Sequence, residues 1–341
     1  LHFAYPGDLQ TRTGGYGYDR RVLAALGDAG WDVHLVPLWN GFPERPDHAA
    51  AEAALAAVPD DCVLVIDGLA FGVLDDWAQR QGDRVRLFAL VHHPLALETG
   101  LSEDVQATYT ATERRALSHA IGVVVTSPAT AKTLIESYGV RADALVVATP
   151  GTDPVPLAPG SGEVPCILSV GSLTRRKGHD VLIAALASLQ DLSWNCRIVG
   201  SQHLDPAVAL QLEKQIADCH LADRVVLVGE VDDARSEFAR ADIFALASRY
   251  EGYGMVFAEA LAHGLPIVGC AAGAVPDVVP QAAGLLVPPD DPQAFAEALG
   301  RLLNDPTTRI EMADAAAVAG AQLPSWRDAA ATIARFIEER G

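Results

Sequence analysis

Short apolar runs alternate with helical patterns along the whole chain, and this alternation most constrains how the chain can fold. Leu1–Tyr5 predicts a strand that leads through a glycine loop into a helix at 16–27, a second strand is predicted at 31–38, and the order starts again at Cys166. Later in the chain, strands are predicted at 225–229 and 284–287 and a turn at 272–277. Strands separated by helices pair in parallel, which is typical of a doubly wound α/β domain. Four prolines and two glycines between Pro150 and Gly160 predict a linker between two such domains.

The composition is that of a folded protein and excludes some classes of partner. Of 341 residues, 50% are hydrophobic and 20% charged, and the length suits two domains better than one core. A net charge of −19 argues against a nucleic-acid partner and against mainly electrostatic binding to anionic lipid. A charged helix predicted at 101–119 is expected to place Glu113 on a solvated face.

The cysteines and the hydropathy pattern indicate a compartment. Five scattered cysteines without a C-x-x-C motif predict reduced thiols and no zinc site. No apolar run approaches the length of a membrane span, and no signal peptide is visible. We therefore expect a cytoplasmic protein that is at most peripheral at the inner face of a membrane.

The stretch from Arg249 to Gly264 follows an apolar strand and has the features of an anion-binding turn. Glycines there let a ligand approach the backbone, and the helix predicted at 255–263 begins with free N–H groups and the positive end of its dipole. Glu251 before the turn and Glu259 inside the helix can accept hydrogen bonds from sugar hydroxyls. Together these features predict a sugar-nucleotide site.

A second candidate site is the basic loop at 171–179, which follows a predicted strand at 166–170. Its three consecutive basic residues stand between glycines in a chain that is otherwise acidic. Arg176 and Lys177 suit a diphosphate, and ligands of open α/β sheets collect at the ends of strands. The alternative is a solvated run of charge; the position at a strand end favours phosphate.

The first glycine loop contains Arg12, Gly14 and Gly15 directly before a helix. Its spacing is not G-x-G-x-x-G, so a dinucleotide site is only weakly indicated. The loop either faces a ligand or is a plain strand-to-helix turn that needs glycine for steric reasons. Two adjacent glycines behind an arginine favour the ligand.

Polar residues also follow two other predicted strands of the first half. Asp67 ends the strand at 62–66, where it either faces a ligand or caps the following helix. His92 and His93 follow the next strand; both are suited to a polar substrate contact, although a pair of loop histidines bonded to backbone is the alternative. Glu98 lies close enough in sequence to reach the same place.

These motifs resemble a known family. Glu251 and Glu259 form E-x7-E in EGYGMVFAEAL, which resembles the signature of the retaining glycosyltransferases of family four. GSLTRRKG resembles the donor-phosphate loop of that family, TGGYGYDRR its N-terminal glycine loop, and VHHP the place of its histidine. GLPIVGCAAGAVPDVV and GLLVPPDDPQAFAEAL resemble the segments that follow the motif. The resemblance covers nearly the whole chain and is stronger in the second half, although Tyr253 stands where Phe is common.

The resemblance implies a role for each matching position. Arg176 and Lys177 would bind the donor diphosphate, Glu251 would contact the transferred sugar, and His92 rather than His93 would contact the sugar or the acceptor. The other donor-binding positions that it implies are Gly14, Gly15, Gly171, Gly254, Met255, Val256 and Glu259, with Glu259 on the ribose. Further candidates for the acceptor or the cleft are Arg12, Asp67, His93 and Glu98.

The resemblance also implies the architecture and the reaction. We expect an α/β protein of the GT-B fold, with two Rossmann-like domains facing a central cleft and a C-terminal helix crossing back to the first. An acceptor domain is predicted at 1–154 with 324–341, and a nucleotide-sugar donor domain at 155–323. The enzyme would move a hexose-type sugar from a nucleoside diphosphate sugar to a hydroxyl of a saccharide, lipid or small metabolite, with retention. No cofactor or metal is expected, because there is no D-x-D motif and two cations with a helix dipole could serve instead.

Other functions are alternatives that experiment can separate. A sugar-nucleotide epimerase on the same fold would act on the donor without an acceptor, and a phosphorylase would need a bound cofactor for which no convincing lysine is visible. A nicotinamide dehydrogenase is disfavoured by the absence of G-x-G-x-x-G. A non-catalytic protein that binds nucleotide sugars is disfavoured because both acidic and basic site residues are intact.

Overall fold

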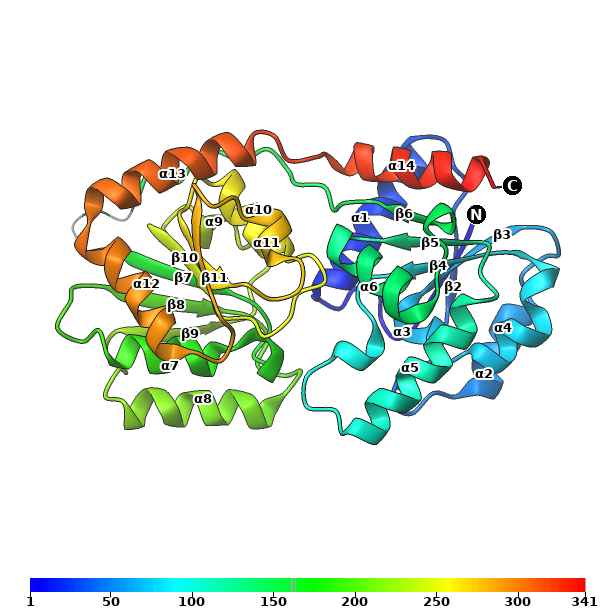
Figure 1. Cartoon of the computed structure of the whole chain (residues 1–341), viewed down its shortest axis with the longest axis horizontal. Coiled ribbons are helices and arrows are strands. Elements are labelled where there is room, and N and C mark those ends of the chain that lie inside the picture. Colours follow the sequence, from blue (N-terminus) through cyan, green and yellow to red (C-terminus); the bar gives the residue numbers. More distant parts are fainter. Residues whose placement is uncertain (161, 163, 341) are drawn as a thin grey trace. The chain divides into compact units, whose positions relative to one another are not determined.

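The computed structural model describes residues 1–160, 162 and 164–340, and it divides into two compact units. The first unit comprises Leu1–Gly151 and Pro324–Gly341, and the second comprises Thr152–Leu323 (Figure 1). Of the predicted domain ranges, residues 161 and 163 in the donor range and residue 341 in the crossing segment lie outside the described residues. Each unit contains one six-stranded parallel sheet, so the prediction of two Rossmann-like α/β domains is confirmed.

The sheet of the first unit has the strand order β2-β1-β3-β4-β5-β6. Its strands are β1 (His2–Tyr5), β2 (His34–Pro37), β3 (Val63–Asp67), β4 (Arg86–Val91), β5 (Gly122–Val125) and β6 (Leu145–Val147). Because every pair is parallel, the ends of β1, β3 and β4 lie at one edge, where Asp67 is the last residue of β3 and His92 directly follows β4. The strand predicted to begin at Trp31 begins only at His34, because β1, its one neighbour, begins at His2.

Helices complete the first unit. They are α1 (Gly14–Asp28), α2 (His48–Ala56), α3 (Gly68–Phe71), α4 (Asp75–Gln81), α5 (Glu103–Leu117) and α6 (Pro128–Tyr138). The helix that Asp67 was expected to cap is α3, whereas α4 was not predicted, because its seven residues are too few to show a clear helical period. The expectation that Glu113 lies on a solvated face is wrong: it is 1% exposed and accepts a hydrogen bond from the Leu95 N–H.

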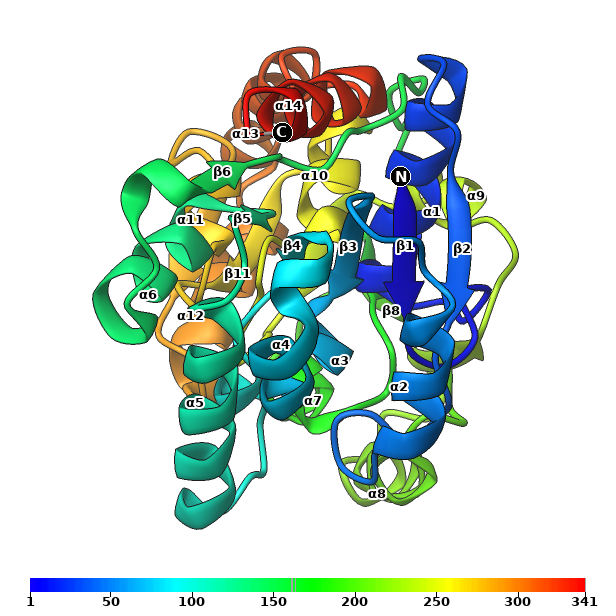
Figure 2. The same cartoon turned by 90° about the vertical axis from the view of Figure 1, so that its right-hand side faces the viewer.

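The last helix, α14 (Trp326–Glu338), belongs to the first unit and packs beside α1 and β6 (Figures 1 and 2). Ser325 and Asp328 close its start as a capping box, in which each side chain bonds the other residue's backbone N–H. Trp326 meets the edge of Tyr18 at 5.9 Å between ring centroids, and Phe336 meets Phe88 at 6.0 Å. The prediction of a C-terminal helix that crosses back to the first domain is confirmed.

The second unit repeats the architecture with the strand order β12-β11-β10-β7-β8-β9. Its strands are β7 (Cys166–Val170), β8 (Asn195–Val199), β9 (Val225–Gly229), β10 (Ile243–Leu246), β11 (Ile267–Cys270) and β12 (Gly284–Val287). Its helices are α7 (His179–Ala187), α8 (Pro206–Asp218), α9 (Arg235–Phe238), α10 (Met255–Ala262), α11 (Val275–Val278), α12 (Pro292–Asn304) and α13 (Pro306–Gly320). The segment predicted as a turn at 272–277 contains α11.

Successive side chains of the central strand β10 point to opposite faces of this sheet and build two cores. Ile243 packs with residues of α7, α8 and α12, whereas Phe244 packs with residues of α10 and α13. Phe257 of α10 meets Phe244 edge to face at 5.4 Å and is fully buried. Burying such a ring contributes about 2–3 kcal/mol, which holds α10 against the sheet. Within the described residues, the helices are all too short or too polar to cross a membrane.

Candidate active site

The side chain of Glu251 is the centre of a charged cluster in the second unit. Lys177 Nζ lies 2.7 Å from its Oε1 and Arg176 Nη1 3.4 Å from its Oε2, while Ser248 Oγ donates a 2.6 Å hydrogen bond to Oε1. Burial alone would raise the pKa of Glu251, but the two cations hold it at about 2. The structure thus brings three predicted site residues together around one ionised carboxylate.

The basic loop is held in shape by a buried histidine that the sequence did not single out. His179, the first residue of α7, lies 3.2 Å from the Gly171 carbonyl oxygen through Nε2 and 3.4 Å from Ser169 Oγ through Nδ1. Burial lowers the pKa of His179 to about 4, so its ring is neutral and adds no charge to the loop. The alkyl chain of Lys177 lies over Gly171, whose missing Cβ would be 3.1 Å from Lys177 Cδ.

Arg249 ties the two motifs together. Its guanidinium makes two hydrogen bonds to Asp180, at 3.0 and 2.7 Å, and one of 2.7 Å to Asp290. Its backbone N–H donates to the Arg176 carbonyl at 2.8 Å, and its side chain also contacts the Arg175 carbonyl. This arginine therefore fixes the basic loop beside the turn that carries Glu251.

The start of α10 presents unpaired backbone donors. Gly254 caps the helix with φ 92°, a left-handed conformation that suits glycine, and a Cβ there would be 2.8 Å from the Phe257 ring. Among the described residues, no side chain caps this end, so the N–H groups of Met255 and Val256 stay available together with the positive end of the dipole. Gly264 follows the helix with φ 71°, a left-handed conformation that also suits glycine.

Glu259, in the middle of α10, is half-buried beside other acids. Burial raises its pKa to about 7, and the charges of Asp153 and Asp233 add to the rise while Lys177 opposes it. Glu259 therefore exchanges a proton near neutral pH, whereas Glu251 stays ionised. The two glutamates of the E-x7-E motif therefore differ in their pKa values and in their charge near neutral pH.

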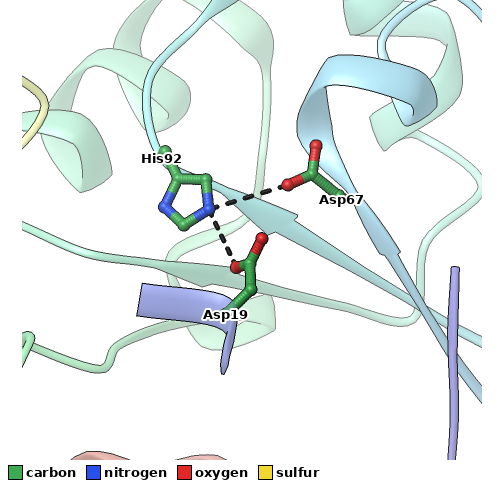
Figure 3. Close-up of side chains that lie close together, drawn as sticks. All are labelled: Asp19, Asp67 and His92. Carbon is green, nitrogen blue, oxygen red and sulfur yellow. Dashed lines mark hydrogen bonds and ion pairs between the residues drawn. The ribbon is translucent and has the colours of Figure 1, made fainter. Parts of the chain in front are cut away.

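A separate polar cluster lies in the first unit (Figure 3). His92 Nε2 is 3.0 Å from Asp19 Oδ1 and 3.7 Å from Asp67 Oδ2, and Figure 3 shows that nitrogen turned towards both carboxyl groups. Asp67 also accepts the Leu69 N–H at 2.7 Å, so it both caps α3 and faces the histidine. Asp19 was missed by the sequence analysis, although it stands one helical turn after Gly15 and on the same face.

The charges of this cluster depend on one another. Burial raises the pKa of Asp67, and the neighbouring Asp19 raises it further. Burial works to lower the pKa of His92, but the two carboxyl groups outweigh it and raise that pKa. The three side chains offer ligand atoms within 4.8 Å of one another, a grouping that can also surround a metal ion, while the 3.0 Å separation is itself that of a hydrogen bond.

The remaining candidates of the first unit behave differently from one another. A Cβ on Gly15 would be 3.2 Å from His92 Cδ2, so this glycine permits close packing of the ring, whereas a Cβ on Gly14 would meet nothing within 4 Å. His93 Nε2 pairs with Glu98 Oε2 at 3.5 Å, away from the Asp19 cluster. Arg12 is exposed on the loop. The roles of all predicted site residues in binding or transfer stay predictions.

Known proteins resemble the chain in sequence and in structure. Residues 164–305 match the family model described as Glycosyl transferases group 1. Over 241 residues the chain is 32% identical to the D-inositol 3-phosphate glycosyltransferase of Xylanimonas cellulosilytica. The matched region covers 65% of this chain and 57% of that protein. The chain thus spans less than two thirds of the length of the curated relatives it matches.

Two solved structures share the fold over almost the full chain. The sucrose-phosphate synthase of Thermosynechococcus elongatus superposes with a TM-score of 0.83 at 24% identity, covering 99% of this chain and 98% of that one. Anabaena HepE in complex with UDP-glucose superposes with a TM-score of 0.80 at 19% identity, covering 99% of both chains. At these identities the likeness concerns the arrangement of strands and helices.

Proposed function

This chain belongs, through residues 164–305, to the group 1 glycosyl transferases, and we propose that it moves a hexose-type sugar from a nucleoside diphosphate sugar to an acceptor hydroxyl. The observation that carries the proposal is the cluster of the second unit. Arg176 and Lys177 contact the buried carboxylate of Glu251, whose turn leads into the start of α10 at Gly254. The cations and the backbone N–H groups can bind a diphosphate, and the carboxylate can bind sugar hydroxyls at the same time.

Negative charge grows on the diphosphate as its bond to the sugar breaks. Lys177, Arg176 and the N–H groups at the start of α10 are suited to stabilise that charge, and preorganised groups of this kind usually supply the larger part of catalysis. His179 and Arg249 contribute by holding the loop in shape before the ligand arrives. The ordering is therefore already present in the protein without a ligand.

Donor binding exchanges partners within the cluster. Without a ligand, the carboxylate of Glu251 is the counterion of Lys177 and Arg176. A bound diphosphate takes over the two cations, and Glu251 with Ser248 turns to the hydroxyls of the transferred sugar. With a pKa of about 2, Glu251 is a poor base, so we assign it to binding rather than to a covalent or proton-transfer step.

Glu259 is assigned to the nucleotide ribose. Its carboxyl group has a pKa of about 7, so it can accept hydrogen bonds when ionised and donate one when protonated. The two glutamates then divide the donor between them: Glu251 binds the sugar that leaves and Glu259 the nucleotide that stays.

Further parts of the proposal are retention, independence from metal and cofactor, and a place in the cytoplasm with at most loose attachment to a membrane. Retention is favoured by the resemblance of E-x7-E to the signature of retaining enzymes. Metal independence is favoured by the two cations and the helix dipole, which supply the charge that a divalent ion would supply. These features are part of one hypothesis and are tested with it.

A donor screen followed by an acceptor screen tests the proposal. Thermal shifts are measured with UDP-, GDP-, ADP- and dTDP-sugars, since a donor near saturation stabilises the folded state by several kcal/mol. The stabilising donor is then incubated with acceptors that include D-inositol 3-phosphate, the compound in the name of the Xylanimonas relative. We expect a product that contains both donor sugar and acceptor. Conversion of the donor without an acceptor would indicate an epimerase instead, and binding without turnover a sensor.

A further inference from the structure

Three side chains from distant parts of the sequence converge in the first unit: Asp19 of α1, Asp67 at the end of β3 and His92 after β4 (Figure 3). Both carboxyl groups are 1% exposed, and the His92 side chain is 17% exposed. Burying two acids beside one imidazole is costly unless every charge is matched. Their arrangement therefore points to a purpose beyond packing.

The contacts of His92 determine which of its nitrogens carries the proton in the neutral ring. Nε2 faces Asp19 Oδ1 at 3.0 Å and Asp67 Oδ2 at 3.7 Å. Carboxylates accept hydrogen bonds, so Nε2 must be the N–H donor. Within the described part of the chain, Nδ1 has no hydrogen-bond partner. Nδ1 is also not one of the fully enclosed atoms, so it keeps some exposed surface. It is therefore the nitrogen that a ligand can reach.

The two carboxyl groups also need a proton between them. Asp19 Oδ2 and Asp67 Oδ2 are both enclosed, and no group of the residues that the structure describes donates a hydrogen bond to either. Two ionised carboxylates side by side repel, whereas one shared proton converts that repulsion into a hydrogen bond. Burial and the neighbouring Asp19 raise the pKa of Asp67, which agrees with Asp67 as the group that carries the proton.

The surroundings fix the ring in this orientation. Gly15 leaves only enough space for the ring, because a Cβ there would lie 3.2 Å from Cδ2, and the Tyr18 ring meets the imidazole edge to face at 5.3 Å. Thr126 Oγ1 donates to the His92 carbonyl at 3.3 Å. The titratable groups around the cluster include Tyr16 and Tyr18. Burial raises the pKa of both phenols, Asp19 adds to the rise in both, and Asp67 adds to it in Tyr16, so both phenols are neutral.

We propose that Asp19 and Asp67 are positioning residues that share one proton and hold His92 as the Nε2–H tautomer, so that Nδ1 accepts a hydrogen bond from a hydroxyl group of a sugar or polyol substrate. The inference deepens the proposed function and rests on it for the identity of the ligand. The protonation states of the three side chains are inferred independently of the proposed function.

The first test needs no substrate. Side-chain ¹⁵N NMR of the whole protein at pH 9, with His92→Gln to assign the resonance, is expected to show a protonated Nε2 and an unprotonated Nδ1. Asp19→Asn should lower the pKa of His92 by about one unit or more, because it removes the charge at 3.0 Å. Asp67→Asn should lower that pKa less than Asp19→Asn does, because Asp67 lies farther from Nε2, at 3.7 Å, and the amide imitates a protonated carboxyl group that can still donate to Asp19.

The second test uses the donor and acceptor pair found for the proposed function. Asp19→Asn is expected to lower kcat/KM at least tenfold and to move the acidic limb of its pH profile, while Asp67→Asn retains most activity and Asp67→Ala does not. Equal loss in both asparagine variants would overturn the shared proton. Absence of any donor, with the NMR result as expected, would refute the proposed function and leave the positioning intact.

Two NMR outcomes would overturn the positioning itself. One is an unprotonated Nε2 in the wild-type protein. The other is that the protein carries one bound metal ion per chain and that removal of this ion by EDTA shifts the His92 resonance. In that case a metal ion and not a proton would hold the three side chains together. Asp104→Asn, on the exposed start of α5, is the matched control for both aspartate variants.

Discussion

Lys177 Nζ lies 2.7 Å from Glu251 Oε1, so the lysine expected to bind phosphate and the glutamate expected to bind sugar are partners in the absence of either. The pair is partly enclosed, with side-chain exposures of 12% and 6%, so each charge stabilises the other. A ligand has to replace this contact with two new ones. The first two predictions follow from that exchange.

Replacing Lys177 by alanine should weaken binding of the stabilising nucleoside diphosphate sugar by about 10- to 100-fold, the range that corresponds to a lost charge-assisted hydrogen bond of about 1.5–3 kcal/mol. Isothermal titration calorimetry measures the change. Lys214→Ala, at an exposed position of α8, is the matched control and should bind like the wild type. Unchanged affinity in Lys177→Ala would remove this lysine from the donor site.

Replacing Glu251 by glutamine should separate binding from turnover. The substitution removes the Glu251 carboxylate, which competes with a diphosphate for Arg176 and Lys177, so the free nucleoside diphosphate should bind as tightly as before or more tightly. Transfer should fall by at least about 100-fold, because the interaction with the sugar in the transition state is lost. A parallel loss of nucleotide affinity and rate would show that Glu251 instead maintains the shape of the site.

Glu259 should make stability depend on pH. Its folded-state pKa of about 7 lies above the unfolded value near 4.5, so its contribution is fully present below pH 4.5 and is lost as pH rises through 7. Glu259→Gln should therefore be equally stable near pH 4.5 and more stable than wild type by about 1–2 kcal/mol at pH 8.5. Thermal unfolding at several pH values, with the exposed Glu213→Gln as control, measures this. A difference that does not grow with pH would contradict it.

Replacing Arg249 by lysine should loosen the basic loop. A lysine cannot make the paired hydrogen bonds to Asp180 and the bond to Asp290 at the same time. Amide hydrogen exchange at 171–178 should become faster, and donor affinity should fall about tenfold, while the exchange of α8 stays the same. If the loop exchanges as in the wild type, its order does not depend on this arginine.

The fold was predictable because its signals are local. Apolar runs such as Val225–Gly229 and Gly284–Val287 have the bounds expected from the sequence, since strands buried on both faces carry few polar residues. The expected start of β2 was wrong because the partner strand and not the run of residues sets where pairing begins. Glu113 was misplaced because a buried glutamate bonded to a loop N–H looks, in sequence, like any charged helix residue.

The site was predictable only where short motifs carry it. Glu251 and Lys177 were each recognised from their motifs. Their ion pair was not predicted, because it joins positions far apart in sequence. The roles of Ser248, Arg249 and His179 also depend on tertiary contacts, so no sequence motif predicted them. Asp19 is the exception, because its position one helical turn after Gly15 could have revealed it.

The most direct test of the proposed sugar transfer is ³¹P NMR of the stabilising donor, incubated with the protein and a pool of polyol, sugar and sugar-phosphate acceptors. The account predicts that the paired diphosphate signals of the donor convert to those of free nucleoside diphosphate only when acceptor is present, and that Lys177→Ala abolishes the conversion. Equal release without acceptor, or a donor that stays intact with every acceptor while Lys214→Ala and the wild type are folded, would contradict it.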